Sequence, residues 1–536
     1  MLWKQLFARK TLEMLDAEAK GENRLRRVLG PIGLTSLGVG AIIGAGIFVM
    51  TGRAAAQDAG PAIIVSYCVA GLGCLFAALC YAEFASTAPV AGSAYTYAYA
   101  TLGELFAWII GWDLILEYAM ACACVAASWS KYLNEFLKLF GTEFNPRLSH
   151  DPATLHKLGF PEAIPGFNLA AMFIILACTV ILVIGIRESA TTNALLVATK
   201  LGVVIFVIVV GVRYVSWENW TGVPVENRLI PNNPAEKWGI LGLLGLNDIL
   251  LPIDESVRSN FAPYGLSGIM LGASIVFFAY IGFDAISTHA EEARRPNRDV
   301  PIGILTSLGL CTVLYIGVAA VITGMVPYPQ IDPNAAVAAA FRQKGEATDS
   351  ALLKGAGGLI ATGALAGMTS VLLITFLSQA RIFLAMARDG LLPPRIFGAI
   401  HERFRTPHLS TMLTGGIIAV VAAFTPILKL EEMVNIGTLM AFVMVCAAVL
   451  ILRIKRPEAH RPFRCPLVYL VAPLGIGVNF IMMLFLPWDT WMRLVVWLVV
   501  GLCIYFGYGV WHSALGNALR GKTTIPGFDA GDSATD

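Results

Sequence analysis

Apolar residues fall into twelve stretches along the chain, each about as long as a bilayer is thick, with polar, Pro-rich or Gly-rich segments between them. A transmembrane helix needs about 20 consecutive apolar residues to cross the hydrocarbon core. The pattern therefore predicts an all-α integral membrane protein of about twelve transmembrane helices. The predicted spans are 31–52, 62–87, 104–130, 168–187, 192–214, 264–288, 302–325, 356–387, 409–426, 432–453, 467–487 and 493–513.

Composition supports one membrane domain of residues 31–515. Only 14% of the 536 residues are charged and 57% are hydrophobic, whereas soluble domains carry about 25% charged residues. Residues 1–30 precede the first span, and their stretch 2–18 fits an amphipathic helix lying on the membrane surface. Residues 516–536 form a short polar tail.

Positive charges set the expected orientation. Most of the 38 Lys and Arg residues fall on one side when the N-terminus is placed in the cytoplasm, and such residues concentrate in cytoplasmic loops. We therefore expect a multi-pass protein of the plasma membrane with both termini cytoplasmic. The formal charge of +2 suggests no nucleic-acid partner.

The first span is unusual in its glycine content. It contains Gly38, Gly40, Gly44 and Gly46, and each interior glycine costs a helix about 0.5–1 kcal/mol relative to alanine. We expect the helix to open at residues 44–46, where the exposed amides and positive dipole end of its second half suit a carboxylate. Close packing of helices through small residues is the alternative reading.

The sixth span shows a related pattern. Two adjacent aromatics precede Gly282, and Asp284 follows it. If this helix opens between Phe278 and Gly282, the free carbonyls of its first half suit an ammonium group. Spans one and six each begin a set of five, and an odd number of spans inverts the second set, as in inverted-repeat transporters. The expected repeats are about 31–215 and 264–453, with extra helices at about 467–515. Two such gaps at a fixed distance would recognise an α-amino acid.

Two charged residues lie inside predicted spans. Lys200 is well within the fifth span, and a lysine there is costly unless it is paired, hydrated or neutral. Burial favours its neutral form, which suits a proton carrier, although the side chain could also extend to the interface. Glu117 in the third span either attracts a cationic substrate side chain or serves a structural pair.

An enzymatic function finds little support in the sequence. No phosphate loop, Ser–His–Asp spacing or metal-ligand cluster is present. We therefore expect no catalytic residue, no cofactor and no metal.

Several blocks together resemble the amino acid–polyamine–organocation superfamily, in particular the bacterial form of its cationic amino acid transporters. The resemblance spans about residues 27–516. Its strongest blocks are Gly40-Ala41-Ile42-Ile43-Gly44-Ala45-Gly46-Ile47-Phe48, Cys80-Tyr81-Ala82-Glu83-Phe84, Gly92-Ser93-Ala94-Tyr95, residues 111–118, residues 283–301 and residues 381–392. The family implies a LeuT-type 5+5 inverted repeat plus two C-terminal helices, and amino acid transport by alternating access.

The resemblance also implies roles for individual residues. It places the substrate carboxylate on the amides of Ala45 and Gly46, with Gly44 making the break and Ile43 among the substrate-binding residues. Many relatives have Ser or Thr at position 45. A lysine at position 200 replaces a bridging sodium ion in similar transporters, which implies proton coupling. Glu117 is implied to face the pocket, and Thr375 matches a position that affects long cationic side chains. The implied ammonium ligands are the carbonyls of Ile42, Phe278, Ala279 and Ile281.

The most economical reading is an amino acid/proton symporter for cationic or small neutral L-amino acids. An exchanger and a transport-inactive amino-acid sensor use the same pocket and stay open as alternatives. The expected partners are the amino acid, protons and membrane lipids. The sequence leaves open whether a small membrane-protein partner binds.

Overall fold

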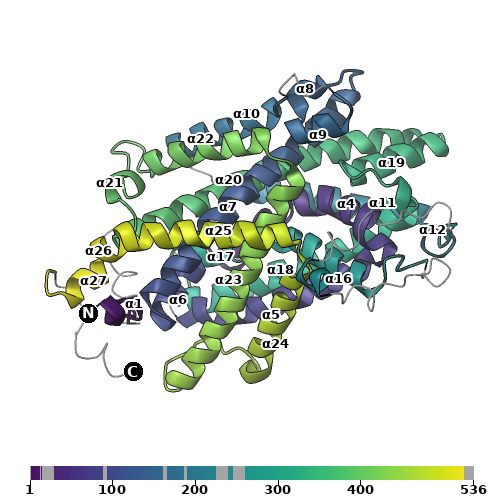
Figure 1. Ribbon diagram of the computed structural model, residues 1–536. Coiled ribbons are helices and arrows are strands. Elements are labelled where there is room, and N and C mark those ends of the chain that lie inside the picture. The colour runs from purple at the N-terminus through teal and green to yellow at the C-terminus, as the bar shows by residue number, and fades with distance from the viewer. Residues whose placement is uncertain are drawn as a thin grey trace.

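The computed structural model describes residues 2–11, 14, 29–87, 93–160, 166–185, 190–224, 239–244 and 260–523. These residues form an all-helical bundle, as Figure 1 shows. The one β-type contact in these ranges is an isolated parallel bridge between Leu29 and Ala293. This bridge joins the start of the first span to the segment that follows the sixth.

The first five-helix set begins with an interrupted helix. Its first half is α3, and its second half runs through η1, α4 and η2. Four further helices complete the set. The bounds are α3 (Pro31–Ile42), η1 (Gly46–Met50), α4 (Thr51–Ala54), η2 (Ala55–Ala59), α5 (Ile63–Thr87), α7 (Glu104–Lys138), α10 (Leu169–Ile184) and α11 (Ala190–Gly211).

The second set repeats this order of elements. It also begins with an interrupted helix, and a further helix pair follows it at the end of the bundle. The bounds are α16 (Gly265–Val276), η6 (Phe277–Tyr280), α17 (Ala285–Thr288), α18 (Pro296–Met325), α20 (Ala351–Arg388), α22 (His408–Phe424), α23 (Ile427–Lys455), α24 (Val468–Phe485) and α25 (Trp488–Ile504).

The helices are long and apolar enough for a membrane. In the described ranges, nine helical segments have the length and hydropathy of a span, and three shorter apolar helices accompany them. Every predicted span coincides with one of these elements. The all-α, multi-span membrane fold is therefore confirmed, although α7 continues to Lys138 and α18 already begins at Pro296.

Both ends of the described chain lie at the same end of the bundle, which we name the inner end (Figure 1). The prediction of one amphipathic helix over 2–18 is wrong in its extent, because α1 (Leu2–Leu6) has only five residues. Gln5, Ala8 and Lys10 are instead buried against the protein. Of this stretch, residues 12, 13 and 15–18 lie outside the described residues.

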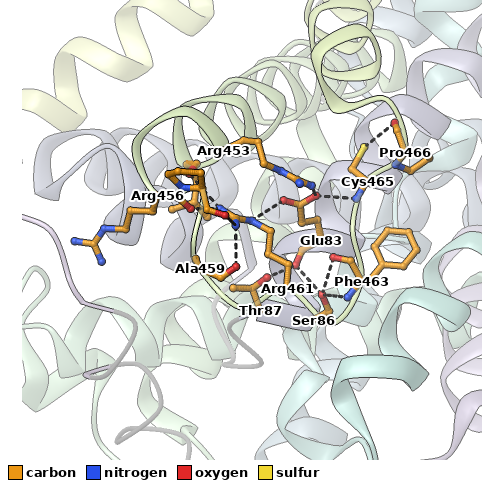
Figure 2. A network of polar contacts seen from close by, with 12 residues as sticks. Glu83, Ser86, Thr87, Arg453, Arg456, Ala459, Arg461, Phe463, Cys465 and Pro466 are labelled. Carbon is orange, nitrogen blue, oxygen red and sulfur yellow. Dashed lines mark hydrogen bonds and ion pairs between the residues drawn. The ribbon is translucent and has the colours of Figure 1, made fainter.

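A polar network ties α5 to the segment after α23 at the inner end, as Figure 2 shows. Glu83 on α5 accepts a hydrogen bond from Arg453 (2.5 Å), and Arg461 approaches its other carboxylate oxygen (3.2 Å). The amide of Cys465 also donates to Glu83 (2.7 Å). Burial lowers the pKa of Arg461, while its guanidinium donates to four backbone carbonyls. Glu83 thus connects α5 to the segment that follows α23.

Candidate functional site

The first span opens where its glycines lie. Helix α3 ends at Ile42, and Ile43 has the extended dihedrals φ −75° and ψ 100°. The second half begins at Ala45, and Gly46 starts a π-helical turn. The break therefore falls at Ile43 and Gly44, slightly earlier than the predicted 44–46. Ala45 and Gly46 consequently carry the first amides of a half-helix, which have no intrahelical partners.

The sixth span opens in the predicted region. Helix α16 gives way to the 3₁₀ turn Phe277–Tyr280, and Ile281 leaves the helix with ψ 132°. Gly282 has φ +120°, a conformation that L side chains rarely adopt. A Cβ atom at Gly282 would also lie 2.9 Å from the carbonyl carbon of Ala41. Glycine is therefore required at this position by both conformation and space.

The two breaks are in direct contact. A Cβ atom at Gly46 would lie 2.3 Å from the Cα atom of Ala279. The Tyr315 hydroxyl on α18 joins the same two segments, since its oxygen lies 2.8 Å from the carbonyl of Ile42 and 2.9 Å from that of Ala279. The interrupted helices, far apart in the sequence, thus form one continuous backbone-lined site.

Tyr315 was missed by sequence reasoning. Its hydroxyl contacts two of the four carbonyls that were predicted to bind the substrate ammonium. A third, the carbonyl of Phe278, accepts a hydrogen bond from the Ile281 amide (3.3 Å). The one available signal was a tyrosine inside an apolar span, because a buried hydroxyl needs a partner. That signal does not reveal which partner it finds.

Lys200 lies beside the first break. Its Nζ donates to the carbonyls of Gly40 (2.6 Å) and Ile43 (3.2 Å) on the first span and of Gly367 on α20 (3.5 Å). The side chain is fully buried, so the alternative of extension to the interface is wrong. In the described ranges no carboxylate pairs with it. Lys200 therefore bridges three of the spans that surround the break.

Glu117 is buried in a group of acidic side chains. Asp284 and Asp113 are its electrostatic neighbours, and its carboxylate oxygens make no hydrogen bond with the described residues. Asp284 accepts from the Tyr118 hydroxyl (2.6 Å) and from the Gly282 amide (3.1 Å). The acidic group therefore adjoins the second break, because Asp284 lies two residues after Gly282.

Thr375 lies on α20 near the first break. Val371, one turn earlier on the same helix, meets the position where a Cβ atom of Gly44 would be placed (2.8 Å). Residues four apart share one face of a helix, and Thr375 is buried. Thr375 therefore lies one turn along α20 from the residue that contacts the first break.

One ion pair lies toward each end of the bundle. At the outer end, opposite the inner end, Arg53 on α4 pairs with Glu431 on α23. At the inner end, Arg381 on α20 pairs with Glu292 (2.6 Å), just after α17. Arg53 lies on the second half of the first interrupted helix, and Glu292 lies just after the second interrupted helix. The partner of each lies on a continuous helix. Neither pair of partners was predicted from the sequence.

The part of the chain that the structure describes holds no group of three His, Cys, Asp or Glu side chains arranged for a metal ion. The geometry instead defines a class: a multi-span helical membrane protein whose two interrupted helices meet beside a buried lysine. This is the architecture of a secondary transporter, in which substrate sites lie at broken helices near the bilayer midplane.

Comparisons with known proteins agree with this class. Residues 29–508 match the model of the amino acid permease family. A methylthioribose transporter of Bacillus subtilis is 40% identical over 512 residues, which cover 95% of this chain and 99% of that protein. A branched-chain amino acid permease of the same bacterium is 41% identical, with the same shares covered. The vacuolar cationic amino acid transporter 4 of Arabidopsis thaliana is 36% identical over 82% of this chain and 65% of its own length.

The chain belongs to the amino acid permease family of the amino acid–polyamine–organocation superfamily. It is a membrane transporter and not an enzyme.

Proposed function

We propose that the protein carries amino acids across the plasma membrane by alternating access and couples this movement to protons. The observation that carries the proposal is Lys200, buried with its Nζ on carbonyls of the first span and of α20. Because these partners are neutral, the lysine can lose its proton without leaving an uncompensated buried carboxylate. Its protonation would then decide whether the first span is held against α20.

The two breaks support recognition of an α-amino acid. The amides of Ala45 and Gly46 begin a half-helix whose positive dipole end favours a carboxylate. The carbonyls of Ile42, Phe278, Ala279 and Ile281 would receive the ammonium. Since Tyr315 contacts two of these carbonyls, its hydroxyl must shift or share them when substrate binds.

The ion pairs at both ends support alternating access. Arg53–Glu431 and Arg381–Glu292 each tie an interrupted helix, or the segment next to it, to a continuous helix. Breaking one pair would therefore free one end while the other end stays held. Such hinge and gating movements around a fixed site are characteristic of transporters with broken helices.

We infer that the substrates are cationic or small neutral L-amino acids. Glu117 next to the second break would favour a cationic side chain, while the apolar Ala45 and Phe278 accept a neutral one. The names of the relatives are divided between branched-chain and cationic amino acids and methylthioribose, so neutral substrates have to be compared with charged ones.

We further propose that the inner end faces the cytoplasm, so both termini are cytoplasmic, because most Lys and Arg residues would then lie on that side. The membrane domain would span 31–515, with its repeats at about 31–215 and 264–453.

Uptake into proteoliposomes tests the proposal. Labelled alanine, leucine, arginine and lysine are offered in sodium-free buffer with and without an inward proton gradient. We expect at least one of them to accumulate only with the gradient. Uptake that requires preloaded amino acid would favour an exchanger, and binding without uptake would favour a sensor. Unlabelled methylthioribose as competitor shows whether the site demands both the carboxylate and the ammonium; strong competition would contradict recognition of a zwitterion.

A further inference from the structure

Three buried carboxyl groups follow one another toward the second break. Asp113 and Glu117 lie one turn apart on α7, and Asp284 directly precedes α17. None of the ion pairs formed by the described residues includes any of the three. An ionised carboxylate inside a bilayer is costly without a partner, and neighbouring carboxylates disfavour one another's charge. The three groups are therefore not all ionised together.

Hydrogen bonds identify Asp284 as the ionised member of the group. Its Oδ2 accepts from the Tyr118 hydroxyl (2.6 Å), and its Oδ1 accepts from the Gly282 amide (3.1 Å). Such donors stabilise the charged form of a carboxyl group. Asp113 and Glu117 lack them, because their carboxyl oxygens make no hydrogen bond with the described residues. The negative charge is therefore best placed on Asp284.

A neighbour of Glu117 on α23 favours a protonated carboxyl group. This neighbour is the hydroxyl of Thr438, which already donates its hydrogen to the carbonyl of Val434 (3.0 Å). A hydroxyl has one donor and two acceptor lone pairs. Thr438 can therefore accept a hydrogen bond from a protonated Glu117, but it has no hydrogen left to offer an ionised one.

The other side chains that surround the acidic group bring no positive charge. They come from the helices packed around it and from α7 itself. The Tyr81 hydroxyl, for example, is buried without a hydrogen bond to the described residues, and Asp284 and Glu117 are among its electrostatic neighbours. A cation that reaches Glu117 would thus be the first in this group. The surrounding residues are Tyr81 and Cys74 of α5, Tyr118 of α7, Gln379 of α20, and Gly437 and Thr438 of α23.

We propose that Glu117 carries a proton in the substrate-free protein and gives it up when a cationic substrate side chain binds beside it. The O–H bond of the carboxyl group breaks, the proton passes to water at the open entrance, and the carboxylate pairs with the guanidinium or ammonium group. The net charge of the buried group stays the same, because one positive charge enters as another leaves. A neutral side chain leaves the proton in place. The inference rests on the proposed function, since it concerns the same substrate site.

The driving force for uptake then differs between cationic and neutral amino acids. Arginine releases the Glu117 proton outside when it binds, and Glu117 takes up a proton from inside when arginine leaves. This outward proton movement cancels the inward one proposed for Lys200. Arginine uptake should therefore follow the membrane potential alone, whereas uptake of a neutral amino acid should also follow the pH gradient.

Proton release on binding tests the inference on the full chain in lipid nanodiscs, in weakly buffered solution with a pH-sensitive dye. The probes are L-arginine, L-alanine and L-citrulline, which has the shape of arginine without its charge. Each is titrated to about 10 mM, on the order of the concentration that fills a site of millimolar Kd. We expect arginine to release about one proton per bound molecule more than citrulline. The difference cancels proton exchange at Lys200, which is common to both ligands.

The pH dependence of affinity reports the same proton independently. A ligand that displaces one proton binds about tenfold more tightly for each unit by which the pH rises, as long as the free site is protonated. The ratio of the citrulline Kd to the arginine Kd should therefore rise about tenfold from about pH 6 to about pH 7. This comparison needs only the wild-type chain.

Two variants locate the proton. Glu117→Gln has the shape of the protonated carboxyl group and no proton to give, so arginine should release no more protons than citrulline and the Kd ratio should not change with pH. Asp113→Asn is the matched control, because Asp113 also lacks a donor but does not have Asp284 as an electrostatic neighbour. It should keep both the release and the pH dependence. If Glu117→Gln does not fold, the two ligands on the wild-type chain decide the result.

Equal proton release with arginine and citrulline would overturn the inference. So would release that survives Glu117→Gln, release that is lost in Asp113→Asn, or a chain that binds alanine or citrulline but not arginine. Each of these results leaves the proposed function standing if a neutral amino acid still accumulates with the proton gradient. Proton release without accumulation of any amino acid would overturn the proposed function alone, and absence of binding for every probe would overturn both.

Discussion

Lys200 shows how much a single side chain can depend on its backbone surroundings. A lysine in a membrane span is costly, and the opened helix supplies carbonyls that closed helices would have used for their own hydrogen bonds. The break at Ile43 and Gly44 and the lysine are thus mutually dependent. The lysine stabilises the freed carbonyls, and these carbonyls solvate the lysine.

Lys200→Ala should abolish accumulation driven by a proton gradient, leaving only equilibration of the amino acid. Substrate binding should survive, because the proposed ligands are backbone groups. Uptake and binding on the same preparation separate the two effects. The control is Lys354→Ala, which removes a surface lysine paired with Asp349 (2.6 Å) and should behave as wild type. Accumulation that still follows the gradient would exclude Lys200 as the coupling residue.

Glu117→Gln should weaken binding of arginine and lysine more than binding of alanine. The change removes negative charge beside the second break and keeps the shape of the side chain. Competition binding with the three amino acids measures the ratio. Asp113→Asn, one turn away in the same acidic group, is the matched control and should alter the ratio less. Equal loss for all three amino acids would assign Glu117 a structural role.

His289, directly after α17, should make folding stability depend on pH. Burial, with Arg381 nearby, lowers the pKa of this imidazole from 6.5 to about 4. Its Nδ1 lies 2.8 Å from the carbonyl of Ala285, which favours the neutral ring with a proton on Nδ1. The unfolded chain takes up a proton below pH 6.5, but the folded chain does so only near pH 4.

The folded state should therefore lose about 3 kcal/mol between pH 6.5 and pH 4 through this residue. His289→Asn retains a nitrogen donor and should flatten the pH dependence by that amount. Thermal unfolding in detergent across this pH range measures it. An identical slope in both proteins would show that His289 is not the source.

Among the structural elements, the two interrupted helices and α18 depend on one another most closely. One backbone carbonyl from each interrupted helix, that of Ile42 and that of Ala279, contacts the hydroxyl of Tyr315. Helix α18 thus positions the site although it supplies no proposed substrate ligand. Its tyrosine contacts both interrupted helices at the point where the substrate ammonium is proposed to bind.

Tyr315→Phe should destabilise the substrate-free protein by about 1–3 kcal/mol, because the carbonyls of Ile42 and Ala279 lose a donor. It should also change substrate affinity. Tyr505→Phe is a suitable control, since its hydroxyl donates to Glu104 (2.9 Å), away from both breaks. Thermal unfolding and binding measure the two effects. An unchanged affinity in Tyr315→Phe would separate this tyrosine from the substrate site.

At the scale of the whole molecule, the N-terminal segment packs against the inner end of the bundle. Lys10 pairs with Asp389 after α20 (2.6 Å), and Gln5 donates to Glu104 at the start of α7 (2.9 Å). The carbonyl of Ala8 accepts from the Glu104 amide (3.0 Å). Residues 2–11 therefore connect helices that lie far apart in the sequence.

Lys10→Ala should lower the free energy of unfolding by roughly 3 kcal/mol, because it leaves Asp389 buried without its cation. Lys4→Ala, an exposed lysine on the same segment, should have almost no effect. Denaturation in detergent compares the two variants with the wild-type chain. Equal free energies of unfolding for Lys10→Ala and Lys4→Ala would show that the Lys10–Asp389 pair does not stabilise the fold.

Local features of the chain were sufficient to predict the twelve spans, the two breaks and the unusual position of Lys200. Span length follows from the thickness of the bilayer, and helix opening follows from glycines that lie close together in the sequence. Both can be read without knowing which helices are neighbours.

Packing between helices decided the rest. Tyr315 joins Ile42 to Ala279, Arg53 meets Glu431, and Lys10 meets Asp389 across hundreds of residues. The sequence contains each of these side chains but not the distances between them. Those distances arise only when polar groups on separate helices find one another, because the lipid around the bundle offers them no hydrogen-bond partner.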